Sequence, residues 1–106
     1  MDQLTQSRQG GLFMAHKHFV YMIRCKDDTL YTGYATDVEK RFEKHQAGKG
    51  AKYTRGRSPL ELVYTEGFAT KTEAMQREYA LKQLSKEMKL SLIDQRKEGF
   101  YGSGAT

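Results

Sequence analysis

Two short stretches of apolar and aromatic residues, separated by a polar turn, constrain the fold of this chain most strongly. The segments Phe19 to Cys25 and Leu30 to Ala35 are rich in aromatic and β-branched side chains, which favours strands. Turn-forming residues occupy Lys26 to Thr29 between them. Strands this close in sequence pair as an antiparallel hairpin. We predict a loop with an odd number of residues, which places Tyr21 and Tyr31 on one face because side chains alternate along a strand.

Two capping-box sequences predict where helices begin after the hairpin. In such a box the side chain of a Ser or Thr accepts a hydrogen bond from a helix amide. The side chain of a Glu three residues later accepts one from the backbone N–H of that Ser or Thr. Thr36 to Glu39 predicts a helix from near Asp37 to near Gly48, since glycine is common just after a helix. Thr70 to Glu73 predicts a second helix that ends near Leu84.

A third strand and a third helix complete the pattern. Apolar and polar residues alternate from Leu60 to Gly67, as in a strand with one buried face. Ser85 is the predicted cap of a helix from Lys86 to about Lys97, whose inward side chains we expect to be Met88, Leu92 and Ile93. The order β-β-α-β-α-α predicts an α+β fold in which a three-stranded antiparallel sheet is flanked by helices.

The length of 106 residues is that of a single domain. We predict that residues 1–15 and 100–106 are flexible tails around a domain that spans 16–99. The longest apolar run, Phe19 to Ile23, is too short to cross a bilayer, and residues 1–15 lack the pattern of a signal peptide. The single cysteine, Cys25, excludes an internal disulfide and suits a reducing compartment. We therefore expect a cytoplasmic protein without a membrane partner.

Positive charge is concentrated in one part of the chain. The net charge is +5, and between Lys40 and Arg57 seven Lys and Arg side chains stand against a single Glu. Residues Lys49 to Ser58, which overlap the end of this segment, are predicted to form a basic loop that includes Tyr53. Such a surface favours an anionic partner. Nucleic acid and an acidic membrane surface both fit, and charge alone does not choose between them.

Three polar side chains fall where the helical pattern calls for apolar ones. At about 100° per residue, Arg41 and His45 lie beside or within the apolar stripe of the first predicted helix, and Glu78 lies inside that of the second. One interpretation is structural: Arg41 and Glu78 form an ion pair, long side chains reach water, and His45 is an ordinary buried histidine. The other interpretation is that the three belong to a functional site.

Together with the two strand tyrosines, these side chains could hydrolyse a phosphodiester. A phenol beside a cation can act as a general base, because the cation favours phenolate. Arginine can bind a phosphate through two parallel hydrogen bonds. A lone carboxylate suits Mg²⁺, which keeps most of its waters and takes few protein ligands.

The motifs in this order resemble those of the GIY-YIG nuclease family. Its two triplets match Val20-Tyr21-Met22 and Tyr31-Thr32-Gly33, and its helix arginine, with a histidine four residues later, matches Arg41 and His45. Its metal-binding glutamate matches Glu78.

The stretch Gly50 to Arg55 resembles the small, stand-alone bacterial branch of that family. The resemblance extends from about His18 to Gly99, so it covers the whole predicted domain. Some members carry an Asn further along, and none occurs between Leu90 and Asp94 here.

The resemblance implies a role for each matched side chain. Tyr21 would be the general base that activates water, and Tyr31 would position that water or the phosphate. Arg41 would steady the phosphate, and His45 would assist by hydrogen bonding or as an alternative base. Glu78 would hold a single divalent metal ion, Mg²⁺ or Mn²⁺.

Two further assignments accompany these catalytic ones. Gly33 would allow close packing, a role that needs no side chain. DNA would lie along the basic loop, which supplies the predicted nucleic-acid-binding residues Lys49, Lys52, Tyr53, Arg55 and Arg57.

The function implied by the resemblance is a divalent-metal-dependent DNA endonuclease of low sequence specificity, acting in DNA repair or recombination. Its partner would be single-stranded, branched or duplex DNA, and the sequence indicates no obligate protein partner. Two alternatives stay open. The chain could be a non-catalytic nucleic-acid-binding module that retains the fold, or an adaptor whose basic surface binds acidic proteins.

Overall fold

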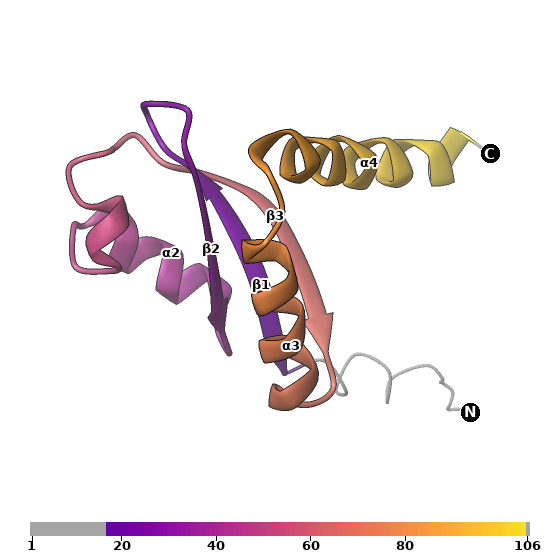
Figure 1. The fold of residues 1–106 in the computed structure, drawn as a ribbon, viewed down its shortest axis with the longest axis horizontal. Helices are drawn as coiled ribbons and strands as arrows, with labels where there is room; N and C mark the ends of the chain where they lie inside the picture. Colours follow the sequence, from indigo (N-terminus) through magenta and orange to yellow (C-terminus); the bar gives the residue numbers. More distant parts are fainter. Residues whose placement is uncertain (1–16, 106) are drawn as a thin grey trace.

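The fold is known from a computed structural model that describes residues 17–105 of the chain, with side chains as far as Arg96 (Figure 1). The predicted tail at residues 1–15 lies outside the described residues. The order of elements is the predicted β-β-α-β-α-α, with one short 3-10 helix added. The elements are β1 (His18–Arg24), β2 (Leu30–Ala35), α2 (Val38–Gln46), η1 (Lys52–Thr54), β3 (Glu61–Phe68), α3 (Lys71–Lys82) and α4 (Lys86–Ala105).

The three strands form one antiparallel sheet in the order β2-β1-β3. Tyr21 pairs with Gly33 across the hairpin, and Ile23 pairs with Tyr31. The connecting loop, residues 25–29, has an odd number of residues. The side chains of Tyr21 and Tyr31 therefore lie on the same face of the sheet, and the prediction of an odd loop is confirmed.

Helices cover both faces of the sheet. Figure 1 shows α2 passing behind β2, while α3 lies in front of β1. The central strand β1 is buried on both sides, and its side chains alternate between two apolar clusters. The cluster on the α3 side contains Val20, Met22, Leu30, Tyr64, Ala74, Leu81 and Ile93. The cluster on the α2 side contains Tyr21, Ile23, Cys25, Ala35 and Leu60.

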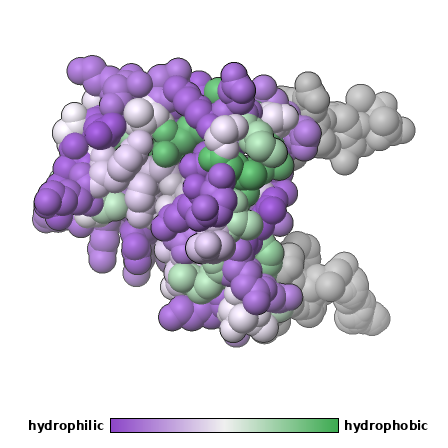
Figure 2. Space-filling view, in the orientation of Figure 1, coloured by the Kyte–Doolittle hydropathy of each residue, from purple (hydrophilic) through white to green (hydrophobic). Residues whose placement is uncertain are grey.

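Hydrophobic residues are visible in more than one place on the face shown in Figure 2. Hydrophobic residues gather where α3 leads into α4, whereas the end of the molecule that carries α2 and the basic loop is mainly hydrophilic. None of the helices in the described part of the chain has both the length and the apolar character needed to cross a membrane.

The helix caps agree with the predicted boxes in one case and differ in the other. Thr70 and Glu73 form a complete capping box, with backbone-to-side-chain distances of 3.2 and 3.3 Å. At the start of α2 the cap is Asp37 instead of Thr36, because the Asp37 carboxylate accepts a hydrogen bond from the Lys40 amide at 3.1 Å. Asp is at least as good a cap as Thr, and the helix begins one residue later as a result.

The last helix differs most from the prediction. Ser85 caps it as expected, since its hydroxyl accepts a hydrogen bond from the Met88 amide at 3.2 Å. The helix then continues to Ala105, past the predicted end near Lys97 and through most of the segment 100–106 predicted as a tail. Lengthening an existing helix needs no new nucleus, and this segment contains no proline.

One of the three side chains predicted to face inward from this helix does not do so. Ile93 is fully buried and Leu92 packs against the core, but Met88 is 55% exposed. Five residues separate Met88 from Ile93, which places the two about 140° apart around the helix, so they cannot face the same core.

Candidate active site

The two tyrosines and the histidine predicted from the sequence meet on the α2 side of the sheet. Tyr21 lies on β1, Tyr31 on β2 and His45 on α2. The ring centroids of Tyr31 and His45 are 5.2 Å apart, and that of Tyr21 is 6.2 Å from Tyr31 and 5.9 Å from His45. The Tyr21 hydroxyl oxygen lies 2.9 Å from His45 Nε2, which makes a buried hydrogen bond.

Tyr21 is 1% exposed, and its surroundings favour the neutral phenol. Burial raises the pKa of Tyr21 well above its usual value, and Tyr31 and Glu78 raise it further. The positive charge of Arg41 lowers the same pKa but does not outweigh burial. The expectation that a nearby cation makes this phenol more acidic is therefore wrong. Burial destabilises the phenolate by more than the positive charge of Arg41 stabilises it.

His45, the hydrogen-bond partner of Tyr21, is buried as its helical position predicts. The side chain is 1% exposed, although it sits on an otherwise polar helix. Burial lowers the pKa of His45, and the positive charge of Arg41 lowers it further. The ring is therefore neutral at neutral pH, and a neutral imidazole has one nitrogen free to accept a proton.

Arg41 is exposed on α2. Its guanidinium still acts on both Tyr21 and His45 through its charge. The proposed structural ion pair with Glu78 is not among the ion pairs of the described residues. Glu78 pairs instead with Lys82, one helical turn on, at 3.3 Å. Arg41 is therefore available to bind an anion next to Tyr21.

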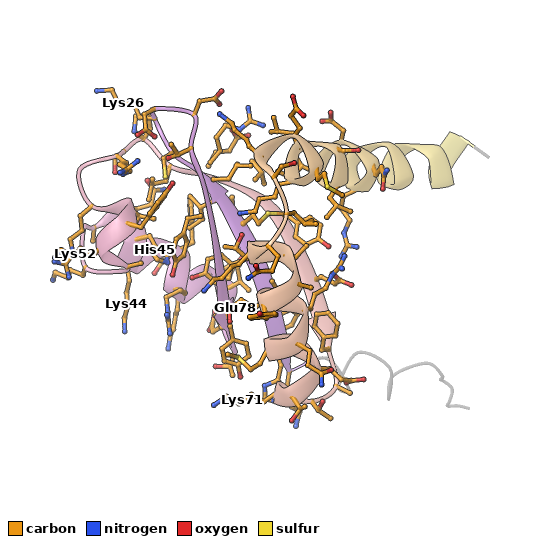
Figure 3. All side chains as sticks on the ribbon, in the orientation of Figure 1. Lys26, Lys44, His45, Lys52, Lys71 and Glu78 are labelled. Carbon is orange, nitrogen blue, oxygen red and sulfur yellow. The ribbon has the colours of Figure 1, made fainter. Side chains whose placement is uncertain are left out.

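Glu78 approaches the same centre from the other helix layer (Figure 3). It lies on α3, which packs against β1 and β2, and its side chain is only 14% exposed. Its negative charge contributes to the raised pKa of Tyr21, so the two groups are electrostatically coupled. The strand β2 is at the edge of the sheet. A charged side chain on α3 can therefore interact past that edge with side chains on the α2 side of the sheet.

The residues present fit a divalent ion that carries mostly water. No group of three or more His, Cys, Asp or Glu side chains that could enclose a metal occurs within residues 17–96. A hard cation such as Mg²⁺ binds through one or two carboxylates, several waters and substrate phosphate. Glu78 offers one largely buried carboxylate. The side chain of its partner Lys82 is half exposed, so its ammonium group can leave the carboxylate and be solvated by water instead.

The basic loop is joined to the tyrosine–histidine cluster by aromatic contacts. The Tyr53 ring lies 5.8 Å from that of Tyr31 and is 43% exposed. The Arg57 guanidinium stacks on Tyr53 at 4.5 Å and pairs with Asp27 at 2.7 Å, so part of its charge is neutralised. The remaining cations of the predicted set, Lys49, Lys52 and Arg55, are exposed.

Sequence reasoning assigned no role to three residues that hold the histidine. Thr54 Oγ1 lies 2.9 Å from His45 Nδ1, and the Ala51 amide lies 3.2 Å from the same nitrogen. At Gly50 any Cβ would collide with the His45 ring, so this position must remain glycine for the loop to pass. All three fall inside Gly50 to Arg55, the stretch that resembles the stand-alone branch, and that match was the available signal.

Gly33 lies directly under the Tyr21 ring, which explains the need for a glycine in β2. A Cβ at Gly33 would lie 2.6 Å from the Tyr21 hydroxyl oxygen and 3.0 Å from Cε2 of Tyr31. We predict that Gly33→Ala destabilises the fold by about 1–3 kcal/mol through overpacking and separates the phenol from His45. Urea denaturation measures the first effect and cleavage of DNA the second. Unchanged stability and unchanged activity together would contradict this assignment.

Comparison with known proteins matches most of this chain to one protein family. The family model described as the GIY-YIG catalytic domain matches residues 17–91. The chain is 56% identical over 80 residues to the UPF0213 protein SH2523 of Staphylococcus haemolyticus, covering 76% of this chain and 98% of that protein. It is 58% identical over 80 residues to the UPF0213 protein NP_0776A of Natronomonas pharaonis, covering 76% and 94%.

A solved structure gives the same result. The solution NMR structure of the protein EF2693 from E. faecalis is similar with a TM-score of 0.54 and 36% sequence identity, over 76% of this chain and 85% of that chain. The fold, the positions of the two triplets on β1 and β2, and the matched residues 17–91 all agree. The chain belongs to the GIY-YIG family.

Proposed function

We propose that this protein is a divalent-metal-dependent endonuclease that hydrolyses phosphodiester bonds in DNA. The observation that carries the proposal is the buried hydrogen bond of 2.9 Å between Tyr21 and His45, with the charges of Arg41 and Glu78 acting on the same phenol. A buried phenol bonded to a neutral imidazole is a pair through which a proton can pass. Perturbed groups that converge in this way are typical of functional sites.

The proposed reaction uses each group once. The Tyr21 oxygen takes a proton from the attacking water while its own proton passes to His45 Nε2. The hydroxide attacks phosphorus, the bond from phosphorus to the leaving oxygen breaks, and solvent protonates that oxygen. Arg41 steadies the phosphate through charge-assisted hydrogen bonds, and Tyr31 positions the water or the phosphate.

Glu78 would hold the metal ion, which when bound supplies positive charge to the phosphate and the leaving oxygen. The carboxylate suits this role because it is largely buried and its charge acts on Tyr21. Lys82, which pairs with Glu78, would be displaced toward solvent. The expected ions are Mg²⁺ and Mn²⁺, which both prefer oxygen ligands.

DNA would lie along the exposed cations of the basic loop, with little preference for sequence. Lys49, Lys52 and Arg55 contact phosphates in this proposal, and the exposed ring of Tyr53 stacks on a base. Contacts to phosphates and to base faces do not read base edges. A role in DNA repair or recombination, where substrates are defined by shape, is consistent with that.

Binding to DNA is expected to weaken steeply with salt. Each phosphate contact removed lowers the magnitude of the slope of log K against log[salt] by about 0.9 for duplex DNA and about 0.7 for a single strand. We therefore predict a shallower slope for the Lys49→Ala, Lys52→Ala, Arg55→Ala triple variant, measured by fluorescence anisotropy. Lys71→Ala is the control, because Figure 3 places Lys71 well away from Lys52. An unchanged slope in the triple variant would mean that DNA binds elsewhere.

A second candidate function is a nucleic-acid-binding module without catalysis. The observation that favours it is the stacked pair of Tyr53 and Arg57, which offers a surface for nucleic acid that does not depend on Tyr21 or Glu78. Cleavage distinguishes the two candidates. Labelled DNA incubated with the protein and Mg²⁺ is cut if the site is catalytic, and is bound but intact if it is not.

A further inference from the structure

We propose that a cavity beside α2, lined by Lys40, Arg41 and Lys44, binds the phosphate of the DNA strand next to the one that is cut. The inference rests on the proposed function and extends it, because Lys40 and Lys44 become DNA-binding residues in addition to those of the basic loop. A phosphate bound there would fix the position of the strand relative to Tyr21.

The size of the cavity suits a small anion. It lies where β2 ends and α2 begins, has a volume of about 170 Å³, and is lined by Ala35, Thr36, Asp37, Lys40, Arg41 and Lys44. At about 30 Å³ for each molecule of liquid water, it has room for about six waters. Pockets for drug-sized ligands measure about 300–1,000 Å³. The cavity therefore has space for one phosphate group, and not for a whole nucleotide.

The lining of the cavity is strongly positive. Its three cations stand against the single carboxylate of Asp37, which already accepts a hydrogen bond from the Lys40 amide at 3.1 Å as the cap of α2. Within the described part of the chain, none of the three cations takes part in an ion pair. Arg57 and Arg77, by contrast, each pair with a carboxylate, at 2.7 and 3.0 Å. The charge at the cavity is therefore available to an anion.

The spacing along α2 gathers these cations on one side of the helix. With Lys40 at zero and about 100° per residue, Lys44 lies at about 40° and Arg41 at about 100°. His45 follows at about 140°. The two glutamates of the helix lie on the other side, at about 260° and 300°. One of them, Glu39, lines a separate cavity. The cations therefore form a stripe beside the buried histidine, and Figure 3 shows the side chain of Lys44 extending out from α2.

The cavity adjoins the candidate active site. The positive charge of Arg41 lowers the pKa of both Tyr21 and His45, so its guanidinium lies close to both side chains. Ala35, which also lines the cavity, is two residues along β2 from Gly33, and Gly33 lies directly under the Tyr21 ring. At about 3.3 Å per residue of a strand, these two positions are about 7 Å apart. A phosphate in the cavity is therefore a neighbour of the phosphate at Tyr21.

Inorganic phosphate is the probe for the cavity, followed by ¹H–¹⁵N NMR of the full chain at constant ionic strength. In wild type the largest shifts should fall on the amides of residues 35–44. The Lys40→Ala, Lys44→Ala double variant should lose these shifts, and the Lys40→Arg, Lys44→Arg variant should keep them. Both lysines are exposed, so neither change disturbs the core. Absence of these shifts in wild type, or equal shifts in wild type and the Ala variant, would overturn the proposal.

DNA binding in EDTA measures the same site on the substrate, without cleavage. Loss of one phosphate contact in the Ala double variant should lower the magnitude of the slope of log K against log[salt] by about 0.9 for duplex DNA or about 0.7 for a single strand. The Arg variant should keep the wild-type slope. An unchanged slope in the Ala variant would overturn the assignment of the cavity to DNA.

Cleavage kinetics distinguish a neighbouring phosphate from the reacting one. A contact to a phosphate that does not react is equally strong in the bound substrate and in the transition state. Its loss in the Ala double variant should therefore raise KM and leave kcat unchanged. A fall in kcat with an unchanged KM would overturn the proposal, because the lysines would then act on the phosphate that is cut.

The phosphate site and the endonuclease function can fail separately. Phosphate-induced shifts at residues 35–44 and a shallower salt slope in the Ala variant, in a protein that cuts no DNA, support the phosphate site and overturn the endonuclease function. Metal-dependent cleavage by a protein whose residues 35–44 do not respond to phosphate supports the endonuclease function and overturns the phosphate site.

Discussion

Replacing Tyr21 with Phe is expected to reduce the rate of DNA cleavage by about 100- to 10,000-fold, the range that a general base contributes. The ring would stay in its apolar cluster, but no oxygen would remain to take the proton of water. The lost bond to His45 also leaves Nε2 without its partner, at a cost of about 1–3 kcal/mol in stability. Single-turnover cleavage and thermal unfolding measure the two effects separately.

Tyr34→Phe is the matched control for this variant. Tyr34 lies on the same hairpin and also hydrogen-bonds a histidine, His18, at 2.8 Å. It packs against the cluster on the α3 side, away from His45. Its loss should leave cleavage close to wild type. Equal activity in Tyr21→Phe and wild type would remove Tyr21 from the mechanism, and equal losses in both variants would point to a general effect on the hairpin.

Replacing Glu78 with Ala should abolish metal-dependent cleavage, with a loss of roughly 1,000-fold or more, because a bound metal contributes several kcal/mol to stabilising the developing charge. Binding to DNA should change little, since the basic loop is untouched. The measurement is cleavage across a titration of Mg²⁺, with DNA affinity determined in parallel.

Lys82→Ala separates loss of the metal ligand from loss of the ion pair. Both variants remove the contact of 3.3 Å between Glu78 and Lys82, but only one removes the carboxylate. If Glu78 binds metal, Lys82→Ala stays active and needs less Mg²⁺, because the competing ammonium is gone. If both variants lose activity to the same extent, the ion pair is the important feature and the metal assignment fails.

Local sequence signals predicted the parts of the fold that local chemistry decides. The hairpin, the capping box at Thr70 and the cap at Ser85 each depend on residues a few positions apart. The inward position of His45 followed in the same way from its helical angle relative to Val38 and Phe42. These predictions succeeded because spacing along the chain fixes direction in a strand or helix.

The predictions that failed depend on what surrounds a residue in the folded chain. The pKa of Tyr21 rises because burial outweighs the positive charge of Arg41. Met88 is a different case: it is exposed because it lies about 140° around α4 from the buried Ile93. The contact between Thr54 and His45 depends on the loop folding back onto α2, which no local pattern encodes.

The most direct test of the account is cleavage of labelled single-stranded, duplex and branched DNA by the purified protein with Mg²⁺, with Mn²⁺ and with EDTA. The Tyr21→Phe and Glu78→Ala variants, purified by the same route, exclude a contaminating nuclease. The account predicts that wild type cuts at least one DNA in the presence of metal, that EDTA stops it, and that both variants are inactive while still binding DNA. Binding without cleavage by wild type in either metal would contradict the account and favour the binding module.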